Sequence, residues 1–274
     1  MKKDFGRELS LPPFRGRIDP AWDTPLVQNA LRAPGLLLQD PGACILLKSR
    51  NTVATVSLPL APGKTAAAVL KEFGLRGVNR LKSLVLASKA RKAWRGAAAL
   101  VERKVNTPPP IAYLESRKRG VVDKSYFLAG FVEGAREIRF LWRELDGQAL
   151  DRLLRDAAAF LADAHDRGVL HKDLSDGNIL VKTDPRGGRV FYLLDTNRVR
   201  TRKHVGGPAR MKNLIRLGIP PDQQDRFLGY YARGKALPKI LRRWYKFQKA
   251  WYTGRVNLKK KLRLKQLARK LGIQ

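Results

Sequence analysis

The most constraining feature of the sequence is the order of elements in residues 149–180, where a patterned helix, a glycine, a polar loop and an apolar strand follow one another. In ALDRLLRDAAAFLADAHDRG (149–168), apolar residues recur at helical spacing, which predicts an amphipathic helix that ends at Gly168. VLHKDLSDGNIL (169–180) then places two aspartates, an asparagine and a histidine between apolar flanks. A polar loop between a core helix and a core strand is a candidate site.

The spacing of the polar residues suits phosphoryl transfer. Asp173 and Asn178 are five residues apart in a loop that His171 opens, and Asp195 ends the apolar segment GRVFYLLD, an expected strand. Phosphoryl transfer needs one carboxylate to position and deprotonate the attacking hydroxyl, while a second carboxylate and an amide oxygen hold Mg²⁺ against nucleotide phosphates. The bare spacing also occurs in ordinary polar turns, so a plain surface turn is the alternative.

The charge of the chain indicates an anionic partner. The sequence has 56 Lys and Arg against 23 Asp and Glu, a formal net charge of +33, and its last acid is Asp225. Sixteen basic residues and no acid follow between Arg226 and Gln274, with aromatic residues interleaved in 239–271. Nucleic acid, anionic lipid and phosphorylated substrates all fit such a distribution.

Length and composition favour one large domain or two packed lobes. The chain has 274 residues, 44% of them hydrophobic, which is enough for a substantial core. Its single cysteine, Cys44, excludes a disulfide framework and a cysteine-rich zinc site, and fits a reducing compartment. The N-terminal segment lacks the apolar region of a secretory signal, and no window is apolar enough over a sufficient length to span a bilayer.

Local patterns predict an α+β fold, with strands before the helix of 149–168 and helices after the loop. The other expected elements are a loosely packed lead-in (1–40), two strands with a turn at Lys48–Asn51 (43–58), a third strand or a short helix (65–73), a helix (87–104), strands (110–116 and 125–135) and basic helices after residue 205.

The polar loop resembles the catalytic loop of the protein-kinase-like fold. HKDLSDGN (171–178) is similar to H-R-D-L-x-x-x-N, and LLDTN (193–197) stands where such kinases carry D-F-G. The resemblance implies a bilobal fold with a lead-in at 1–40, a small β-rich N-lobe at 41–134, and a helical C-lobe at 135–274.

The same resemblance implies ATP and Mg²⁺ as cofactors and assigns the polar residues. Asp173 is then the base, Asn178 and Asp195 are magnesium ligands, and His171 is a structural organiser of the loop. Lys71 in AAVLKEF is similar to the lysine of V-A-I-K, which holds nucleotide phosphates.

Further nucleotide contacts are expected elsewhere in the N-lobe. YFLAGFVEG resembles the strand and hinge that present backbone groups to adenine, with Phe131 and Glu133 at linker positions. No glycine-rich loop stands between the first strands, so Lys48, with Arg50 and backbone N–H groups, is the candidate cover for the phosphates.

Two departures from the protein-kinase pattern are evident. The helix that should pair an acid with Lys71 offers only Glu102, although the acid is expected near Ala93 or Gly96. No A-P-E sequence and no long activation segment follow Asp195, which argues against a protein kinase regulated by phosphorylation.

A second resemblance narrows the family. SKARKAWRGAAALVERKVNTPPPIAYLE (88–115) is similar to the lipopolysaccharide kinase family of Kdo kinases, heptose kinases and InaA-like proteins, in which a Trp-bearing helix precedes a T-P-x-P-x-A-x-x-E stretch. The likeness extends over about residues 43–200. It implies ATP-dependent phosphorylation of a sugar hydroxyl on an inner-core glycolipid, by a cytoplasmic enzyme peripheral to the inner face of the cytoplasmic membrane.

The basic tail has a place in this hypothesis. Clustered Lys and Arg with interfacial aromatics favour docking on an anionic membrane surface, and nucleic acid is the less favoured partner.

Two alternatives stay open at this point. A RIO-like atypical kinase or ATPase that acts on ribonucleoprotein has a loop H-x-D-L-S-x-x-N, which residues 171–178 match, and a basic tail suits RNA. A pseudokinase-like basic binding module without turnover is supported by the missing helix glutamate. The complete set of Asp173, Asn178 and Asp195 opposes it.

Overall fold

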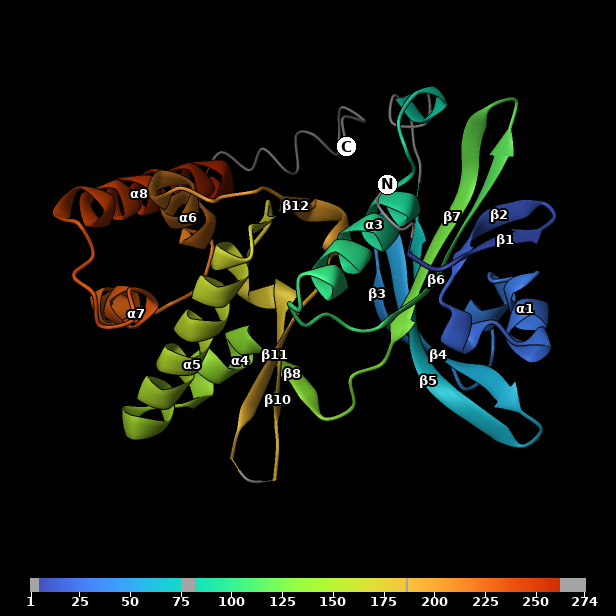
Figure 1. Cartoon of the computed structure of the whole chain (residues 1–274), viewed down its shortest axis with the longest axis horizontal. Coiled ribbons are helices and arrows are strands. Elements are labelled where there is room, and N and C mark those ends of the chain that lie inside the picture. Colours follow the sequence, from blue (N-terminus) through green and yellow to red (C-terminus); the bar gives the residue numbers. More distant parts are fainter. Residues whose placement is uncertain (1–4, 75–81, 186, 262–274) are drawn as a thin grey trace. The chain divides into compact units, whose positions relative to one another are not determined.

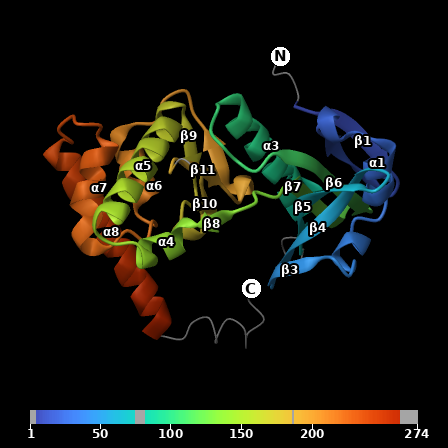
Figure 2. The same ribbon diagram turned by 90° about the horizontal axis from the view of Figure 1, so that it is seen from below.

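The structure, a computed structural model, describes residues 5–74, 82–185 and 187–261. Its contacts divide the chain into two compact units (Figures 1 and 2). Unit 1 contains Met1–Ala135 and Val181–Val199, and unit 2 contains Arg136–Leu180 and Arg200–Gln274. Unit 1 thus takes in 181–199, which the expected C-lobe of 135–274 included. Among the described residues, no helix is long and apolar enough to cross a membrane.

Unit 1 is built on a seven-stranded antiparallel sheet in the order β1-β2-β6-β7-β5-β4-β3. The predicted pair of strands in 43–58 is confirmed, and 65–73 forms a strand rather than a helix. The strands are β1 (Arg7–Leu11), β2 (Phe14–Ile18), β3 (Cys44–Lys48), β4 (Asn51–Ala61), β5 (Lys64–Phe73), β6 (Pro110–Lys118) and β7 (Val121–Gly130).

The prediction of a loosely packed lead-in at 1–40 is wrong for the part that the structure describes. β1 and β2 form a hairpin that joins the sheet through β6, and Leu9 and Leu11 of β1 are buried. Helix α1 (Pro25–Leu31) packs Val27 and Leu31 into the same core with no exposed surface. Polar residues alternate with apolar ones in β1, so the average composition of the segment hides a half-buried strand.

Each face of this sheet carries its own core, and Figures 1 and 2 show α1 on one face and α3 (Lys89–Glu102) on the other. In β5, Ala68 and Leu70 belong to the core that contains α1, whereas Phe73 belongs to the core that contains α3. Side chains alternate along a strand, so Lys71 lies on the α3 side of the sheet. The prediction of a helix in 87–104 is confirmed.

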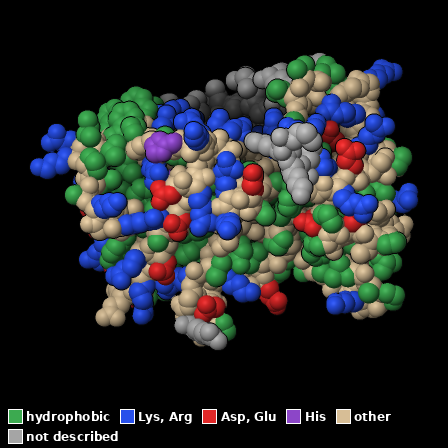
Figure 3. Space-filling view, in the orientation of Figure 1, with side chains coloured by type: hydrophobic (Ala, Val, Ile, Leu, Met, Phe, Trp, Pro, Cys, Tyr) green, Lys and Arg blue, Asp and Glu red, His purple; other side chains and the backbone are tan. Residues whose placement is uncertain are grey.

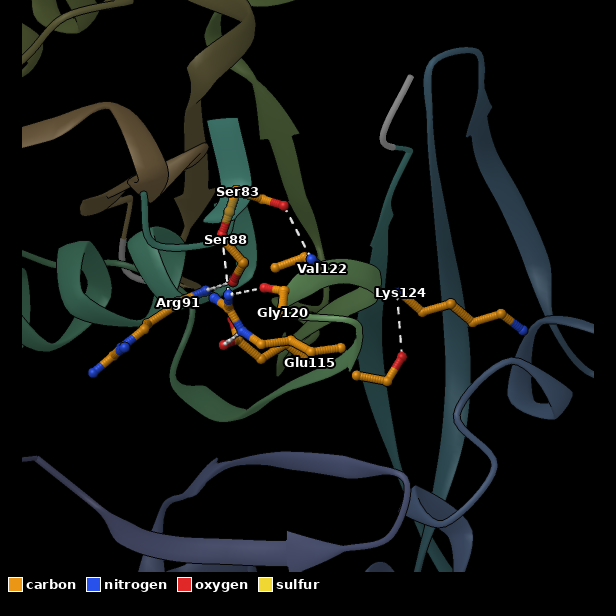
Figure 4. A network of polar contacts seen from close by, with 9 residues as sticks. Ser83, Ser88, Arg91, Glu115, Gly120, Val122 and Lys124 are labelled. Carbon is orange, nitrogen blue, oxygen red and sulfur yellow. Dashed lines mark hydrogen bonds and ion pairs between the residues drawn. The ribbon is translucent and has the colours of Figure 1, made fainter. Parts of the chain in front are cut away.

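A polar network fixes the start of α3 onto the β6–β7 hairpin (Figure 4). The hydroxyl of Ser83 accepts a hydrogen bond from the Val122 N–H at 3.0 Å, and Arg117 donates to the Ser83 carbonyl at 3.0 Å. Ser88 then caps the helix by accepting from the Arg91 N–H at 3.0 Å. The segment just before α3 is therefore fixed to the hairpin, and the helix begins at a defined residue.

Unit 2 is mainly helical. The amphipathic helix predicted in 149–168 is α5, whose apolar stripe is buried as expected. The helices are α4 (Ile138–Glu144), α5 (Gly147–Asp166), α6 (Gly207–Leu214), α7 (Gln224–Tyr231) and α8 (Lys239–Lys261).

Short elements complete the chain. The strands are β8 (Ala135–Glu137), β9 (Val169–His171), β10 (Ile179–Thr183), β11 (Arg189–Leu193) and β12 (Val199–Thr201). The 3₁₀ turns are η1 (Pro20–Trp22), η2 (Leu36–Leu38), η3 (Lys82–Leu84), η4 (Asp176–Asn178), η5 (Thr196–Arg198) and η6 (Pro221–Gln223).

Candidate active site

One cluster of predicted site residues lies in unit 1 and centres on an ion pair between Lys71 and Asp195. Lys71 Nζ is 2.5 Å from Asp195 Oδ1, although the two residues are 124 positions apart in the chain. Asp195 follows β11 with φ of 49° and ψ of 49°, in the left-handed region. That conformation costs an L-residue about 1 kcal/mol, and aspartate tolerates it better than most residues. The structure therefore joins the predicted phosphate lysine to the predicted magnesium ligand.

Close packing of η5 on α3 holds Asp195 at this position. The Thr196 hydroxyl donates to the Ala93 carbonyl at 2.8 Å, and a Cβ on Gly96 would lie 1.9 Å from the Thr196 carbonyl oxygen. Ala93 and Gly96 are the positions near which a glutamate partner for Lys71 was expected. Here they are covered by the turn after Asp195, and the carboxylate of Asp195 itself contacts Lys71.

The T-P-x-P-x-A-x-x-E stretch also supports the segment that leads to Asp195. Thr107, its first residue, is buried and donates from its hydroxyl to the Leu193 carbonyl at 2.9 Å. The Leu193 N–H donates in turn to the Asn106 carbonyl at 2.9 Å. Two hydrogen bonds thus fix the end of β11, two residues before Asp195.

Cations gather around the Lys71–Asp195 pair. The pKa of Lys89, the first residue of α3, is lowered by burial and then by the positive charges of Arg50, Arg198 and Lys71, while Asp195 opposes the shift. Lys89 thus interacts electrostatically with three cations and one carboxylate, and this excess of positive charge in unit 1 suits a polyphosphate. Lys89 and Arg198 were not predicted from the sequence, because neither lies in a motif.

A separate cluster lies in unit 2 and is the loop from His171 to Asn178. The Asp173 N–H donates to Nδ1 of the buried His171 at 3.2 Å. Asn178 Nδ2 donates to the Asp173 carbonyl at 2.8 Å and to the Ser175 hydroxyl at 3.2 Å. Because the amide nitrogen is used within the loop, its hydrogen bonds orient the Asn178 side chain and leave the side-chain carbonyl oxygen for the predicted metal contact.

A buried histidine supports the loop from behind. His165 of α5 places Nδ1 2.6 Å from the Tyr231 hydroxyl and Nε2 3.0 Å from Asn213 Oδ1. Asn213 Nδ2 donates to the His171 carbonyl at 2.7 Å. Burial lowers the pKa of His165 to about 4, so the ring is neutral at pH 7 and bridges α7 to α6 without a buried charge.

The residues after α6 border the loop, and the sequence did not reveal them. Arg216 NH1 lies 2.5 Å from Asp173 Oδ1, and a Cβ on Gly218 would lie 2.3 Å from Asp176 Oδ2. The signal in the sequence is weak: Arg216 is a lone charge in the apolar run LIRLGI, whose Leu214 and Leu217 are buried. A cation within a buried run indicates a partner but not which one.

Three other predicted residues lie at exposed strand ends. Lys48 ends β3, and Phe131 and Glu133 follow β7, all exposed. The Phe131 N–H donates to the Ala67 carbonyl at 3.1 Å, which extends the pairing of β7 with β5 by one residue. Their roles as nucleotide contacts stay predictions.

The donor atoms fit magnesium better than a metal held by protein alone. Within 5–74, 82–185 and 187–261 there is no group of three or more His, Cys, Asp or Glu side chains that could hold a metal. Asn178 in unit 2 and Asp195 in unit 1 each present a hard oxygen and stay predicted ligands. Mg²⁺ commonly takes few protein ligands and completes its shell with waters and phosphate oxygens.

A β-rich unit with a lysine–aspartate pair and a helical unit with an H-x-D-x-x-x-x-N loop define a protein-kinase-like protein. One solved structure, described as WaaP in complex with acyl carrier protein, is similar in fold with a TM-score of 0.58 and 20% identity over 89% of this chain and 98% of that chain.

The family follows from the sequence itself. The Lipopolysaccharide kinase (Kdo/WaaP) family matches residues 79–231, more than half of the chain, and the protein belongs to this family. It is thus a phosphotransferase of lipopolysaccharide core biosynthesis that acts on sugar hydroxyls.

Other comparisons add little. A Rio2 kinase-ADP/Mg²⁺-phosphoaspartate complex from Chaetomium thermophilum is 17% identical over 82% of this chain and 66% of that chain, with a TM-score of 0.40, too low to support a structural argument. No curated protein matches the sequence significantly.

Proposed function

We propose that the protein transfers the γ-phosphoryl group of Mg·ATP to a sugar hydroxyl of a lipopolysaccharide inner-core glycolipid or a related glycolipid, at the cytoplasmic face of the membrane. Asp173 is the base, Asn178 and Asp195 hold magnesium, and Lys71 holds the phosphates. The contact of Lys71 with Asp195 carries the proposal, because it unites two residues that the kinase motifs assign to phosphate and metal.

The charges of unit 1 favour ATP over a module without turnover. The missing helix glutamate was the main support for such a module, and Asp195 supplies Lys71 with an acid from another element. Arg50, Lys89 and Arg198 add positive charge around the pair, which attracts a triphosphate. Phe131 and Glu133 are the proposed hinge, and Lys48 is the further phosphate contact.

Labelled ATP tests the substrate and the base together. Purified protein with γ-labelled ATP is incubated separately with host membranes, total RNA and total protein. We expect label in the glycolipid fraction, and loss of at least ~100-fold in rate for Asp173→Ala, since a group that positions and deprotonates the acceptor is removed. Asp222→Ala, at an exposed site of unit 2, is the control.

Two outcomes would contradict this proposal. Label in RNA or a ribonucleoprotein would favour the RIO-like alternative. Phosphotransfer to glycolipid at the wild-type rate by Asp173→Ala would exclude this residue as the base.

We also propose that the outer face of α8 docks on anionic lipid. The outer face consists of five exposed apolar residues at heptad-like spacing, namely Ile240, Trp244, Phe247, Trp251 and Leu258. Hydrophobic side chains gather where α8 lies in Figure 3, amid Lys and Arg. Aromatic rings suit the bilayer interface, and each basic residue near an anionic surface contributes about 1 kcal/mol.

Flotation with liposomes tests the outer face. We expect wild-type protein to float with vesicles that contain anionic lipid and Phe247→Ser/Trp251→Ser to stay in solution, while Phe140→Ser, at an exposed site of α4, floats normally. Neutral vesicles should bind the wild type more weakly, because the basic residues lose their partner. Equal flotation of all variants would reject the outer face as a membrane site. The similar WaaP structure is in complex with acyl carrier protein, so binding of this protein is measured for the same variants. If the double variant floats normally but no longer binds acyl carrier protein, the outer face is a site for acyl carrier protein and not for lipid.

A further inference from the structure

The inner face of α8 reaches the segment that borders the predicted catalytic loop. Lys249 Nζ donates to the carbonyl of Ile215 at 2.9 Å and to that of Leu217 at 2.5 Å. These two carbonyls flank Arg216 in the chain. The Arg216 guanidinium also lies over the Tyr252 ring, 5.6 Å from its centroid. Two residues of one helix therefore support Arg216: Lys249 bonds the backbone of both neighbours, and Tyr252 contacts the Arg216 side chain.

The ammonium group of Lys249 is partly removed from water at its contact with the segment at 215–217. It is half-buried, and burial lowers its pKa, while the charge of Asp176 opposes the shift. Both of its hydrogen bonds are to main-chain carbonyls. Desolvation of an ammonium group is costly. Methionine could fill the same volume without that cost, but it could not bond the two carbonyls. We therefore interpret the charge of Lys249 as the group that holds the segment at 215–217 in position.

Arg216 presents a cation directly to the predicted base. Its NH1 lies 2.5 Å from Asp173 Oδ1, and the Arg216 Nε is buried and has no hydrogen-bond partner within the described part of the chain. A buried donor without a partner costs about 1–3 kcal/mol. A guanidinium group has its donors in a fixed plane, so the contact through NH1 restricts the orientation of the Asp173 carboxylate.

The predicted catalytic loop has little positive charge of its own that could lie beside the Asp173 carboxylate. Its basic residue, Lys172, is exposed, whereas Asp173 is partly buried. Phosphoryl transfer brings a negatively charged phosphoryl group up to the base, and a cation between them reduces their repulsion.

We propose that Arg216 is a positioning residue of the phosphotransfer site, held on Asp173 by the inner face of α8. This inference rests on the assignment of Asp173 as the base. It gives α8 two roles on opposite faces: the outer face docks and the inner face positions the base.

Substitutions at Arg216 test the proposal. In Arg216→Met we expect kcat for glycolipid phosphorylation to fall about 100-fold, because misplacement of a reacting group by about 1 Å costs that much, while KM for ATP changes little. Arg216→Lys should lose less, since it keeps the charge without the planar fork. Added guanidinium ion should restore part of the activity of Arg216→Ala, an effect that a purely structural role would not produce.

The link to α8 needs its own variant. Lys249→Met should lower kcat in the same direction by about 10-fold, since the segment at 215–217 loses its anchor while Arg216 remains. Arg226→Met, which removes an exposed arginine 3.4 Å from Asp151, is the matched control and should keep wild-type kcat. Melting temperatures of all variants separate loss of fold from loss of positioning.

The outcomes distinguish this proposal from the proposed function. If the wild type transfers phosphate to no glycolipid, the substrate assignment fails, and the Arg216 variants are then compared on ATP hydrolysis. If Asp173→Ala is inactive but Arg216→Met keeps wild-type kcat, the role of Arg216 is rejected and the base stands. If Arg216→Met does not fold, a wild-type kcat in Arg216→Lys together with no guanidinium rescue in Arg216→Ala rejects it as well.

Discussion

Two ion pairs of the same length lie in the two units of this kinase. Lys71 and Asp195 meet at 2.5 Å in unit 1, and Arg216 and Asp173 meet at 2.5 Å in unit 2. Each joins a carboxylate of a kinase motif to a cation from a distant element. In the first pair both members lie in recognisable motifs. In the second, the arginine lies in no motif and depends on α6 and α8 for its position. Motifs thus identify three of the four residues, whereas only the packing of the chain shows that Arg216 contacts Asp173.

The largest expected effect is on the use of ATP, and it should appear when the pair in unit 1 is broken but not when the pair in unit 2 is broken. Lys71→Met should lower kcat/KM for ATP by about 10³-fold, because a preorganised charge at the phosphates is lost. Arg216→Met should leave ATP binding near the wild-type value. Steady-state kinetics with varied ATP measure both, and Lys92→Met on α3 is the control. An equal rise in KM for ATP in both variants would show that the two pairs serve one function.

The next largest effect concerns the support of the loop in unit 2. The folded protein keeps His165 neutral with a pKa of about 4, against about 6.5 when unfolded, so the stability that this imidazole contributes is full above pH 6.5. It is lost as the pH falls from about 6.5 to about 4, by about 3 kcal/mol in total. Urea unfolding at several pH values measures the slope.

The matched variants are His165→Gln, which bonds without titrating, and His204→Gln at an exposed site. The His165 variant should flatten the slope across this window, and the His204 variant should not change it. A slope that persists in full without His165 would assign the acid sensitivity to other groups.

A smaller effect is expected from the support of the turn in unit 1. Gly96→Ala places a methyl group where 1.9 Å separates it from the Thr196 carbonyl, so α3 and η5 must move apart. We expect a loss of about 1–3 kcal/mol in the free energy of unfolding and a fall in ATP turnover, since η5 follows Asp195 directly. Chemical denaturation and ATPase assays measure the two effects.

Gly229→Ala in α7 is the control for helix propensity. A Cβ at that position meets nothing within 4 Å, so alanine should stabilise the helix by up to about 1 kcal/mol. If Gly96→Ala were stabilising to the same degree, the close approach of η5 to α3 would not matter for the fold.

The structure also changes how the basic tail should be tested. Truncation from residue 239 would remove the outer face, but it would also remove Tyr245, which has no exposed surface, and Lys249, which anchors the segment of Arg216. A truncated protein would therefore lose docking and positioning together. Single substitutions on each face separate the two effects.

Local patterns predicted most elements near the candidate site and fewer elsewhere. The helix α5 and the strands β3, β4, β6 and β7 have strong periodicity, and these predictions hold, whereas the segment of β5 was left open as a strand or a short helix. The hairpin of β1 and β2 was missed, because its polar alternate residues and prolines have the composition of a loop. Its pairing with β6 involves residues about a hundred positions away, which no local pattern contains.

The sequence by itself determined the family and the positive charge of this protein, and it predicted the carboxylates, the amide and the lysine of the candidate site. Only the tertiary structure decided that Asp195 rather than a helix glutamate contacts Lys71, and that Arg216 contacts Asp173. It also decided that Tyr245 is buried while Trp251 on the same helix is exposed. The reason is physical: motifs record short-range spacing, whereas ion pairs and burial depend on which distant elements pack against one another.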